Sequence, residues 1–379
     1  MKAQYLFYYL IILLLSACNA NSEESKSNQL TQKLDVLITQ EHQANRFDGV
    51  VLVGNRTGIV LQKAIGLASR EWGIKMKPEH HFDIASVNKS FFAVLVMKAV
   101  EQGKLQLSDR LTDVLKTYSY QGSFHPDITI HHLLCHTSGL PDYNGIVDSL
   151  AKDNFRAFKR MHFTNAGYVD FMSQLAARFE PGKDFYYSNF AYHLLGIILE
   201  DAFQKSFPEI LQEHIAQPLD MHATFSSTVN EEVHQQVVGA YEYQAASNSW
   251  KKNDFIDLTL GRRIFSTASD LYRWGKALGS EKLLTTASWE KILTNHVAAL
   301  TDQVSYGYGW VVFDGKGDYQ MGKLDLNKPY IIHGGNTGGY KSIVLNVNEG
   351  EWVVTILSNI GRQTNELALT NKIVQLLSR

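Results

Sequence analysis

A chain of 379 residues with 45% hydrophobic and 11% aromatic residues can bury a large core, which excludes a mainly disordered protein. The formal net charge is −2, and no lysine or arginine run is long enough to form a basic patch. This composition argues against nucleic acid as a partner and favours one large domain or two intertwined lobes.

The first residues have the pattern of an export signal. A lysine at position 2 precedes an apolar run from Tyr5 to Leu15, and the sequence then reads Ser-Ala-Cys up to Cys18. The apolar run is too short for a comfortable bilayer-spanning helix and fits a signal peptide. Small residues followed by cysteine are similar to a bacterial lipobox, in which the cysteine is lipidated and becomes the mature amino terminus.

Two interpretations of Cys18 stay open: a lipidated residue, or an incidental cysteine beside an ordinary signal peptide. The polar residues 19–28 favour lipidation, because they would supply a flexible tether. We therefore expect a signal peptide over 1–17, a tether over 18–29 and a folded domain over 30–379. The protein is then exported and held at the bacterial cell envelope by a lipid anchor on its first mature residue.

The folded domain is predicted to begin with a helix and a hairpin. Leucines and an isoleucine recur at helical spacing over residues 30–46. Two strand-like runs, 50–53 and 58–61, flank a short polar turn at 55–57, which is typical of a β-hairpin. The sheet therefore starts near the amino end.

The middle of the chain, from residue 86 to about residue 225, is predicted to be mainly helical. Residues 226–260 are polar and are predicted to be irregular, and residues 266–274 have the pattern of a capped helix. The candidate helices of the middle region span 86–102, 165–178, 188–205 and 207–216.

Strand patterns return near the carboxyl end, and an amphipathic helix follows them over 364–378. Strands at both ends with helices between them indicate an α+β fold, in which a mainly antiparallel sheet is built from both termini and flanked by helices. We place the sheet lobe at about 30–85 and 260–379 and an inserted helical lobe at about 86–225, with the site in a cleft between them. The carboxyl-terminal strand patterns cover 308–313, 330–332, 342–347 and 352–357.

A serine and a lysine lie at helical spacing where the helical region starts. Ser86 would open a helix, and Lys89 would lie one turn along the same face. Serine becomes a nucleophile when a base takes its proton, and a lysine that has lost its charge through desolvation can act as that base. Ser-x-x-Lys alone is weak evidence, because it recurs at Ser149, Ser249 and Ser288 in polar stretches where surface residues are expected.

Two further motifs each occur once. Tyr187-Ser188-Asn189 opens a helix pattern, and His333-Gly334-Gly335 follows a strand pattern. Each has an ordinary explanation, since such a tyrosine often packs in a core and such a histidine often lies on the surface. In this order after Ser-x-x-Lys, however, they resemble the serine β-lactamase-like superfamily, which includes class C β-lactamases, D-alanyl-D-alanine carboxypeptidases, D-aminopeptidases and related esterases. Shorter matches at 134–140, 266–271 and 306–310 extend the resemblance over about residues 30–375.

The resemblance implies a catalytic role for three residues. Ser86 would attack an acyl carbonyl and form an acyl-enzyme. Lys89 would accept the serine proton, for which its pKa must be depressed. Tyr187 would relay the proton to the leaving group and later help to activate water.

The resemblance also implies substrate-binding residues. Asn189 would donate its side-chain amide to a substrate carbonyl, and the backbone N–H groups of Ser86 and Asn336 would stabilise the oxyanion. His333 and Gly335 would line the substrate site, where the glycine allows a close approach.

One departure from the family pattern bears on substrate choice. Many relatives have Lys-Thr-Gly where this chain has His-Gly-Gly at His333, so a fixed positive charge and a hydroxyl are missing and strong β-lactam hydrolysis is less expected. One hypothesis is that Arg262 or Arg263 replaces the lysine as a carboxylate clamp. The ordinary alternative is a surface arginine paired with Asp254 or Asp257.

A metal site is the less favoured interpretation of the histidines. His125, His131, His132 and His136 are close in sequence, but no His-Glu-x-x-His or cysteine cluster accompanies them. Cys135 has no expected disulfide partner if Cys18 is acylated, so a buried thiol is expected.

The sequence thus predicts a serine hydrolase that needs no metal or organic cofactor. Its expected substrates are small amides or esters, such as D-amino-acid peptides, peptidoglycan fragments or short-chain esters. A β-lactamase stays an alternative, as does a protein that binds penicillins or cell-wall peptides without turnover. The oligomeric state is open.

Overall fold

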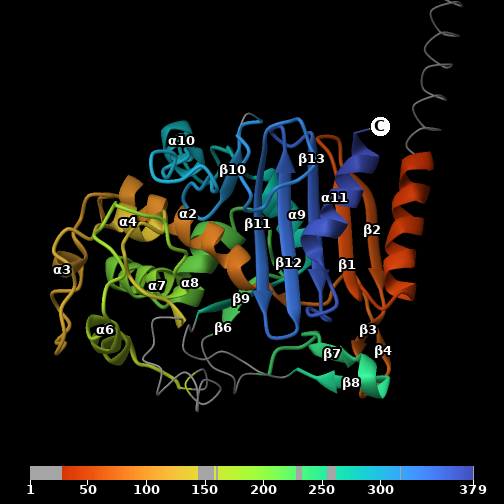
Figure 1. The fold of residues 1–379 in the computed structure, drawn as a ribbon, viewed down its shortest axis with the longest axis horizontal. Coiled ribbons are helices and arrows are strands. Elements are labelled where there is room, and N and C mark those ends of the chain that lie inside the picture. Colours follow the sequence, from red (N-terminus) through yellow and green to blue (C-terminus); the bar gives the residue numbers. More distant parts are fainter. Residues whose placement is uncertain are drawn as a thin grey trace, which may run out of the picture.

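A six-stranded antiparallel sheet with the strand order β10-β11-β12-β13-β1-β2 forms the centre of the molecule (Figure 1). The computed structural model describes residues 28–143, 158, 161–227, 233–253, 262–315 and 317–378. Cys18, the predicted signal peptide and most of the predicted tether lie outside these residues. No helix in the described part of the chain is long and apolar enough to span a bilayer.

The large sheet joins the two ends of the chain. β1 pairs antiparallel with β2 on one side and with β13 on the other. This pairing confirms the α+β fold with a sheet built from both termini. The strands are β1 (Gly49–Gly54), β2 (Ile59–Ile65), β10 (Val311–Phe313), β11 (Tyr330–Thr337), β12 (Tyr340–Val347) and β13 (Trp352–Ser358).

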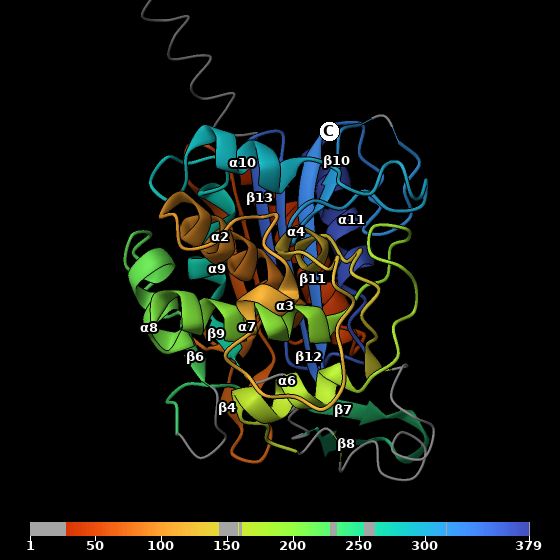
Figure 2. The ribbon, with the colours of Figure 1, turned by 90° about the vertical axis from the view of Figure 1, so that its left-hand side faces the viewer.

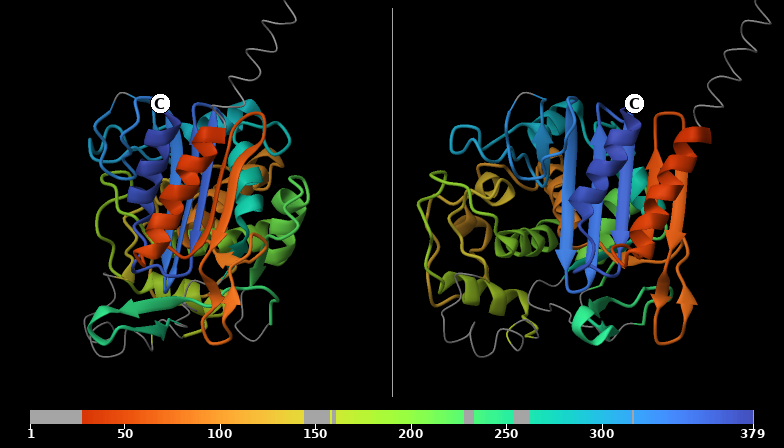
Figure 3. Two further views of the ribbon diagram at one scale, coloured as in Figure 1. Left: turned by 90° about the vertical axis from the view of Figure 1, so that its right-hand side faces the viewer. Right: turned by 45° about the vertical axis from the view of Figure 1, so that its right-hand side comes forward.

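Both faces of the sheet are covered, which explains why β1 is apolar without alternation. Val51 packs in a core with the first helix, residues 28–43, and with α11 (Glu366–Leu377). Leu52 points to the other core, which contains side chains of α9 (Ala268–Lys276). Figure 3 shows the first helix and α11 side by side on the outer face of the sheet.

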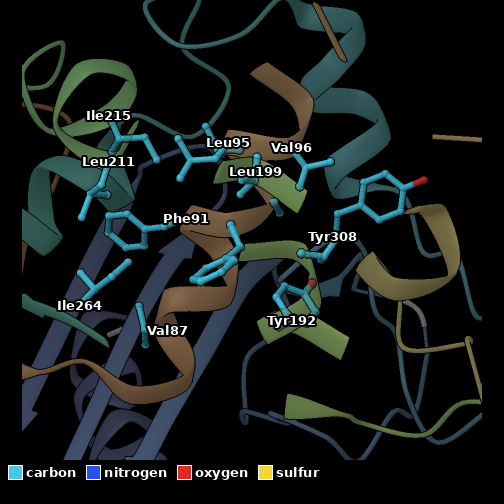
Figure 4. Close-up of a cluster of buried hydrophobic side chains, with 14 of the residues drawn as sticks. Val87, Phe91, Leu95, Val96, Tyr192, Leu199, Leu211, Ile215, Ile264 and Tyr308 are labelled. Atoms are coloured by element: carbon cyan, nitrogen blue, oxygen red, sulfur yellow. The ribbon is translucent and has the colours of Figure 1, made fainter. Parts of the chain in front are cut away.

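The helical lobe lies beside the β10–β11 edge of the sheet (Figure 2). Its central helix is α2 (Asn88–Glu101), which is buried throughout from Lys89 to Met97. Figure 4 shows Val87, Phe91 and Leu95 among apolar side chains of α7, α8 and β9. The other helices outside the sheet layer are α3 (Leu111–Val114), α4 (Ile130–Leu134), α6 (Asn165–Ser173), α7 (Asn189–Phe203), α8 (Phe207–Leu211) with the π-helical turn Gln212–Ala216, and α10 (Thr286–Leu293).

Two details of the helices differ from the sequence-based expectation. α6 ends at Ser173 instead of residue 178, and the following residues run beside Gly139, whose carbonyl accepts a hydrogen bond from Arg178 N–H. The segment after Phe207 changes from α to π geometry within the predicted helix.

The prediction of an irregular segment over 226–260 is wrong for part of its length. β7 (Tyr241–Gln244) and β8 (Ser249–Lys252) form a hairpin joined by a 3₁₀ turn. The hairpin is largely polar and partly exposed, so its sequence lacks the apolar alternation that marks a strand. The remaining short strands are β3 (Leu67–Ser69), β4 (Ile74–Lys75), β5 (Phe82–Asp83), β6 (Phe225–Ser227) and β9 (Arg263–Ser266), the last three in the order β5-β9-β6.

Candidate active site

Ser86 lies in a tight turn between β5 and α2. The turn is the 3₁₀ segment Ala85–Val87, and Ala85 has a left-handed φ of 48°. Such a conformation costs a non-glycine residue about 1–2 kcal/mol, so neighbouring contacts must hold it. Ala85 N–H donates to Asp83 Oδ1 at 2.8 Å, and Ser342 Oγ donates to the Ile84 carbonyl at 2.6 Å. The turn is therefore fixed from both sides.

Gly335 explains how β11 comes close to this turn. A Cβ atom added at Gly335 would lie 2.2 Å from Ser342 Oγ and 2.3 Å from the Ile84 carbonyl oxygen. No real side chain fits at these distances. The glycine at this position lets the strand edge pack directly against the residues that carry Ser86.

Lys89 is the candidate general base for Ser86. Its Nζ lies 3.2 Å from Ser86 Oγ and donates a hydrogen bond to Asn189 Oδ1 at 2.8 Å. The side chain is buried, and desolvation lowers the pKa of Lys89 to about 7. A substantial fraction of the amine is thus neutral near pH 7, with a lone pair that can accept the Ser86 proton.

Asp142 belongs to this cluster, although the sequence analysis assigned it no role. Asn189 Nδ2 donates to Asp142 Oδ2 at 2.9 Å, which fixes the amide so that its oxygen faces Lys89. The negative charge of Asp142 opposes desolvation and raises the pKa of Lys89. Burial raises the pKa of Asp142 itself. The signal in the sequence was an acidic residue two positions after the 134–140 motif.

Tyr187 contacts the nucleophile from the other side. Burial raises the pKa of Tyr187 well above its usual value, and a hydrogen bond with Ser86 opposes this shift. The phenol therefore stays protonated near pH 7 and can act as a donor. Lys89 Nζ lies 4.9 Å from the centre of the tyrosine ring, which is within the range of a cation–π contact when the amine is charged.

His136 positions Tyr187 and is a second residue whose role the sequence analysis missed. Its ring centre lies 4.3 Å from that of Tyr187, and its Nδ1 accepts the backbone N–H of Ser188 at 3.1 Å. The His136 carbonyl accepts a hydrogen bond from Tyr186 N–H. Burial lowers the pKa of His136 well below its usual value, so the imidazole is neutral. The loop and the tyrosine are thereby held together.

His333 is buried in the wall of the same site and is neutral. Its Nδ1 lies 2.8 Å from the Gly334 carbonyl, which can only accept, so this nitrogen carries the proton. Nε2 then accepts a hydrogen bond from Tyr306 Oη at 3.2 Å. Burial and the nearby Lys89 lower the pKa of His333 to about 3. Both ring nitrogens are therefore engaged, and the residue offers no positive charge to a substrate carboxylate.

Most of the site residues predicted from the sequence line one pocket of about 400 Å³. Asn336 lies in it on β11, just beyond Gly335 and opposite Lys341 of β12. Lys89 lies behind the pocket wall, in hydrogen-bond contact with Ser86. The residues that line the pocket are Ser86, Tyr187, Asn189, Val311, Met321, Gly322, Ile332, His333, Gly334, Gly335, Asn336, Ile343, Glu366 and Leu367.

Neither arginine considered as a carboxylate clamp lines this pocket, which corrects that hypothesis. Arg262 is buried and forms an ion pair with Glu200 of α7. Arg263 donates to Asp83 Oδ2 at 2.8 Å and thereby supports the turn that presents Ser86. Asp254 and Asp257, the alternative partners, lie outside the described residues. The local sequence around two adjacent arginines does not indicate which distant acidic residue each of them pairs with.

The histidines near residue 130 have different hydrogen-bond partners. His125 pairs with Glu180 at 2.7 Å, and His131 Nδ1 lies 2.6 Å from Tyr308 Oη. His132 Nδ1 accepts Thr129 N–H at the start of α4. Within the described residues no group of three or more histidine, cysteine, aspartate or glutamate side chains could hold a metal ion. Cys135 is a buried thiol whose pKa burial raises to about 11.

The other Ser-x-x-Lys pairs lack this environment. Ser249 is exposed on β8. Ser288 is buried on α10, contrary to the surface position expected for it, and donates to Glu101 Oε1 at 2.6 Å. Ser149 lies outside the described residues. Of the described Ser-x-x-Lys pairs, the one at Ser86 is the one whose serine lines the pocket.

Comparisons with known proteins identify the family of the chain. Penicillin-binding protein 4* of Bacillus subtilis (strain 168) is 27% identical over 342 residues, which cover 86% of this chain and 71% of that protein. Protein flp of Staphylococcus aureus (strain MW2) is 23% identical over 348 residues, and these cover 89% of this chain and 64% of that protein. The matched region thus spans less than two thirds of Protein flp.

A solved structure and a family model extend this likeness. The D-amino acid amidase from Ochrobactrum anthropi SV3, complexed with D-phenylalanine, has the same fold, with a TM-score of 0.74 at 19% identity over 92% of this chain and 99% of that one. The family model described as Beta-lactamase matches residues 34–377. The chain therefore belongs to the Beta-lactamase family, within the serine β-lactamase-like superfamily of penicillin-binding proteins, amidases and esterases.

Proposed function

We propose that the protein is a serine hydrolase that works through an acyl-enzyme on Ser86. The observation that carries this proposal is the buried amine of Lys89, 3.2 Å from Ser86 Oγ and with its pKa lowered to about 7. A neutral amine at this place can take the serine proton at physiological pH, which a lysine of ordinary pKa cannot do efficiently.

The proposed reaction has two steps. Ser86 Oγ attacks the acyl carbon while Lys89 takes its proton, and the N–H groups of Ser86 and Asn336 hold the oxyanion. The leaving alcohol or amine departs with a proton from Tyr187, which regains one from Lys89. Water then attacks the ester of Ser86 with the same groups acting in reverse, releasing the acid and restoring the serine.

The substrates in this proposal are small amides or esters, including D-amino-acid peptides, peptidoglycan fragments and short-chain esters. The relatives named above, a penicillin-binding protein and a D-amino acid amidase, support this range. A β-lactamase, or a protein that binds penicillins without turnover, is the second candidate. The name of the relative in Bacillus subtilis favours it, whereas the neutral His333 is against tight binding of a carboxylate.

Burst kinetics with p-nitrophenyl acetate test the proposal. We expect a burst of about one equivalent of p-nitrophenol followed by steady turnover. Ser86→Ala should abolish both phases. Ser249→Ala, which removes the exposed serine of another Ser-x-x-Lys pair, is the matched control and should behave as the wild type. A burst without steady turnover would support the binding protein, and a burst that survives Ser86→Ala would refute the mechanism.

The proposed location is the cell envelope, with the lipid on Cys18 as membrane anchor. The lipobox-like residues before Cys18 support this location. We expect the full-length protein to partition into the detergent phase of Triton X-114, and Cys18→Ser to partition into the aqueous phase. Equal partitioning of the two proteins would exclude the anchor.

A further inference from the structure

The pocket extends past Ser86 along one face of the sheet. Ile332 and Gly334 point to the same face of β11, and their cross-strand partners are Val311 and Ile343. Met321 and Leu367 complete this region, which we call the apolar arm. The apolar arm is defined by Val311, Met321, Ile332, Ile343 and Leu367.

Gly334 stands where the arm meets the catalytic residues. A Cβ atom added at Gly334 would meet Ile343 Cδ1 at 3.4 Å, an ordinary van der Waals distance. Packing therefore does not demand glycine here, in contrast to Gly335, where a Cβ would overlap Ser342 and Ile84. Gly334 lines the same pocket as Ser86 and the arm, so its missing side chain leaves space open in that pocket.

The charges around the arm disfavour an anion. Among the described residues that line the pocket, Glu366 is the only charged one, and it lies at the amino end of α11. It forms an ion pair with Lys341 at 2.9 Å, so that lysine is already neutralised. A carboxylate in the arm would meet an acid and, among the described residues of the pocket wall, no unpaired cation.

The arm shares its pocket with Tyr187, the residue proposed to protonate the leaving group. Tyr187, the proposed proton donor, packs against the same core cluster that contains Val311, Ile332 and Ile343. A leaving group protonated by Tyr187 therefore departs into the pocket to which the arm belongs.

We propose that the apolar arm binds an uncharged, apolar leaving group, so that the protein prefers esters or amides of apolar alcohols or amines over substrates whose leaving group carries a carboxylate. This inference rests on the proposed serine hydrolase activity and names its substrate class. Each methylene group buried in the arm should raise kcat/KM by about fourfold.

Two series of neutral esters test the proposal. In the first, acetate is esterified with ethanol, propanol, butanol and pentanol; in the second, the alcohol is ethanol and the acyl chain grows from acetyl to pentanoyl. We expect kcat/KM of the wild type to rise steeply along the first series. Gly334→Val should flatten this rise because its methyl groups fill the entrance, and Gly334→Ala should have a smaller effect in the same direction. Neither substitution should flatten the second series in the same way.

The readout is the ratio of kcat/KM for pentyl acetate to kcat/KM for ethyl acetate, so a general loss of activity cancels. A flat alcohol series in the wild type, or a ratio that Gly334→Val leaves unchanged, would overturn the inference. Failure of the proposed function has a different signature, since no acetyl adduct would then form on Ser86 with any ester.

A charged substrate tests the role of Glu366. We expect 5-acetoxypentanoate, whose leaving alcohol carries a carboxylate, to react at least tenfold more slowly than pentyl acetate. Glu366→Gln removes the acid and leaves Lys341 unpaired, so the ratio of the two rates should shift several-fold toward the carboxylate. Glu351→Gln is the matched control, because Glu351 is also paired with a lysine, Lys328, but does not line the pocket. An unchanged ratio in Glu366→Gln would contradict the charge argument.

Discussion

The protonation of Lys89 is the property of a single residue on which the proposed chemistry depends most. Desolvation lowers its pKa, and Asp142 raises it. The uncharged form is the base, so activity should increase as the pH rises through the pKa of Lys89. The titratable groups that face Lys89 are Asp142, His136, Tyr187, Tyr192 and His333.

We expect the acidic limb of the kcat/KM profile to have its midpoint near pH 7, as the pKa of Lys89 does. Asp142→Asn retains an oxygen that can accept the amide of Asn189 but removes the negative charge that raises the pKa of Lys89. The limb should therefore move to lower pH. The profile is measured with a neutral ester as substrate, at constant ionic strength. If Asp142 had a structural role alone, Asp142→Asn would lower activity at every pH. An acidic limb whose midpoint does not move in Asp142→Asn would contradict this account of Lys89.

Arg263 is the second residue whose effect we can specify. Breaking its pair with the buried Asp83 should lower the free energy of unfolding by about 3 kcal/mol in Arg263→Ala, measured by urea denaturation. The acylation rate should also fall, because Asp83 holds the turn of Ser86. The rate ratio of anionic to neutral substrates should not change. A selective rise of KM for anionic substrates would restore the clamp hypothesis.

At the scale of an element, β11 forms one wall of the pocket and packs against the turn that carries Ser86. The sequence predicted its first residues, because Tyr330, Ile331 and Ile332 are apolar and favour strands. The strand continues to Thr337, which the pattern did not show, since His-Gly-Gly-Asn has little strand propensity. Pairing with β12 holds this half of β11 in place. Tertiary context thus overrides local propensity at the residues nearest the nucleophile.

Gly335→Ala and Gly334→Ala form a matched pair on this strand. We expect Gly335→Ala to slow acylation by about 100-fold, because the added methyl group displaces β11 from the turn of Ser86. Gly334→Ala should slow acylation by p-nitrophenyl acetate far less. Stopped-flow bursts with that ester measure both. Equal effects of the two substitutions would show that the close contact of Gly335 does not position the site.

At the scale of the molecule, the sequence was sufficient for the fold class and for the residues around Ser86. The hairpin of β1 and β2, the carboxyl-terminal strands and α2 all carry strong apolar patterns, and three spaced motifs mark the site. Asp142 and His136 were missed because their roles depend on contacts between α7 and the loop after α4. The polar hairpin of β7 and β8 was missed because Tyr241 alone of its strand residues is buried, so no apolar alternation marks the strands. Partners across the fold, such as Asp83 for Arg263, leave no trace in local spacing.

The central claim is a covalent acyl-enzyme on Ser86. The most direct test is to quench the reaction with p-nitrophenyl acetate in acid during the burst and to measure the mass of the intact protein and of its peptides. We expect one added acetyl group, located on Ser86 and absent from Ser86→Ala. An adduct on another residue, or one that persists in Ser86→Ala, would contradict the claim.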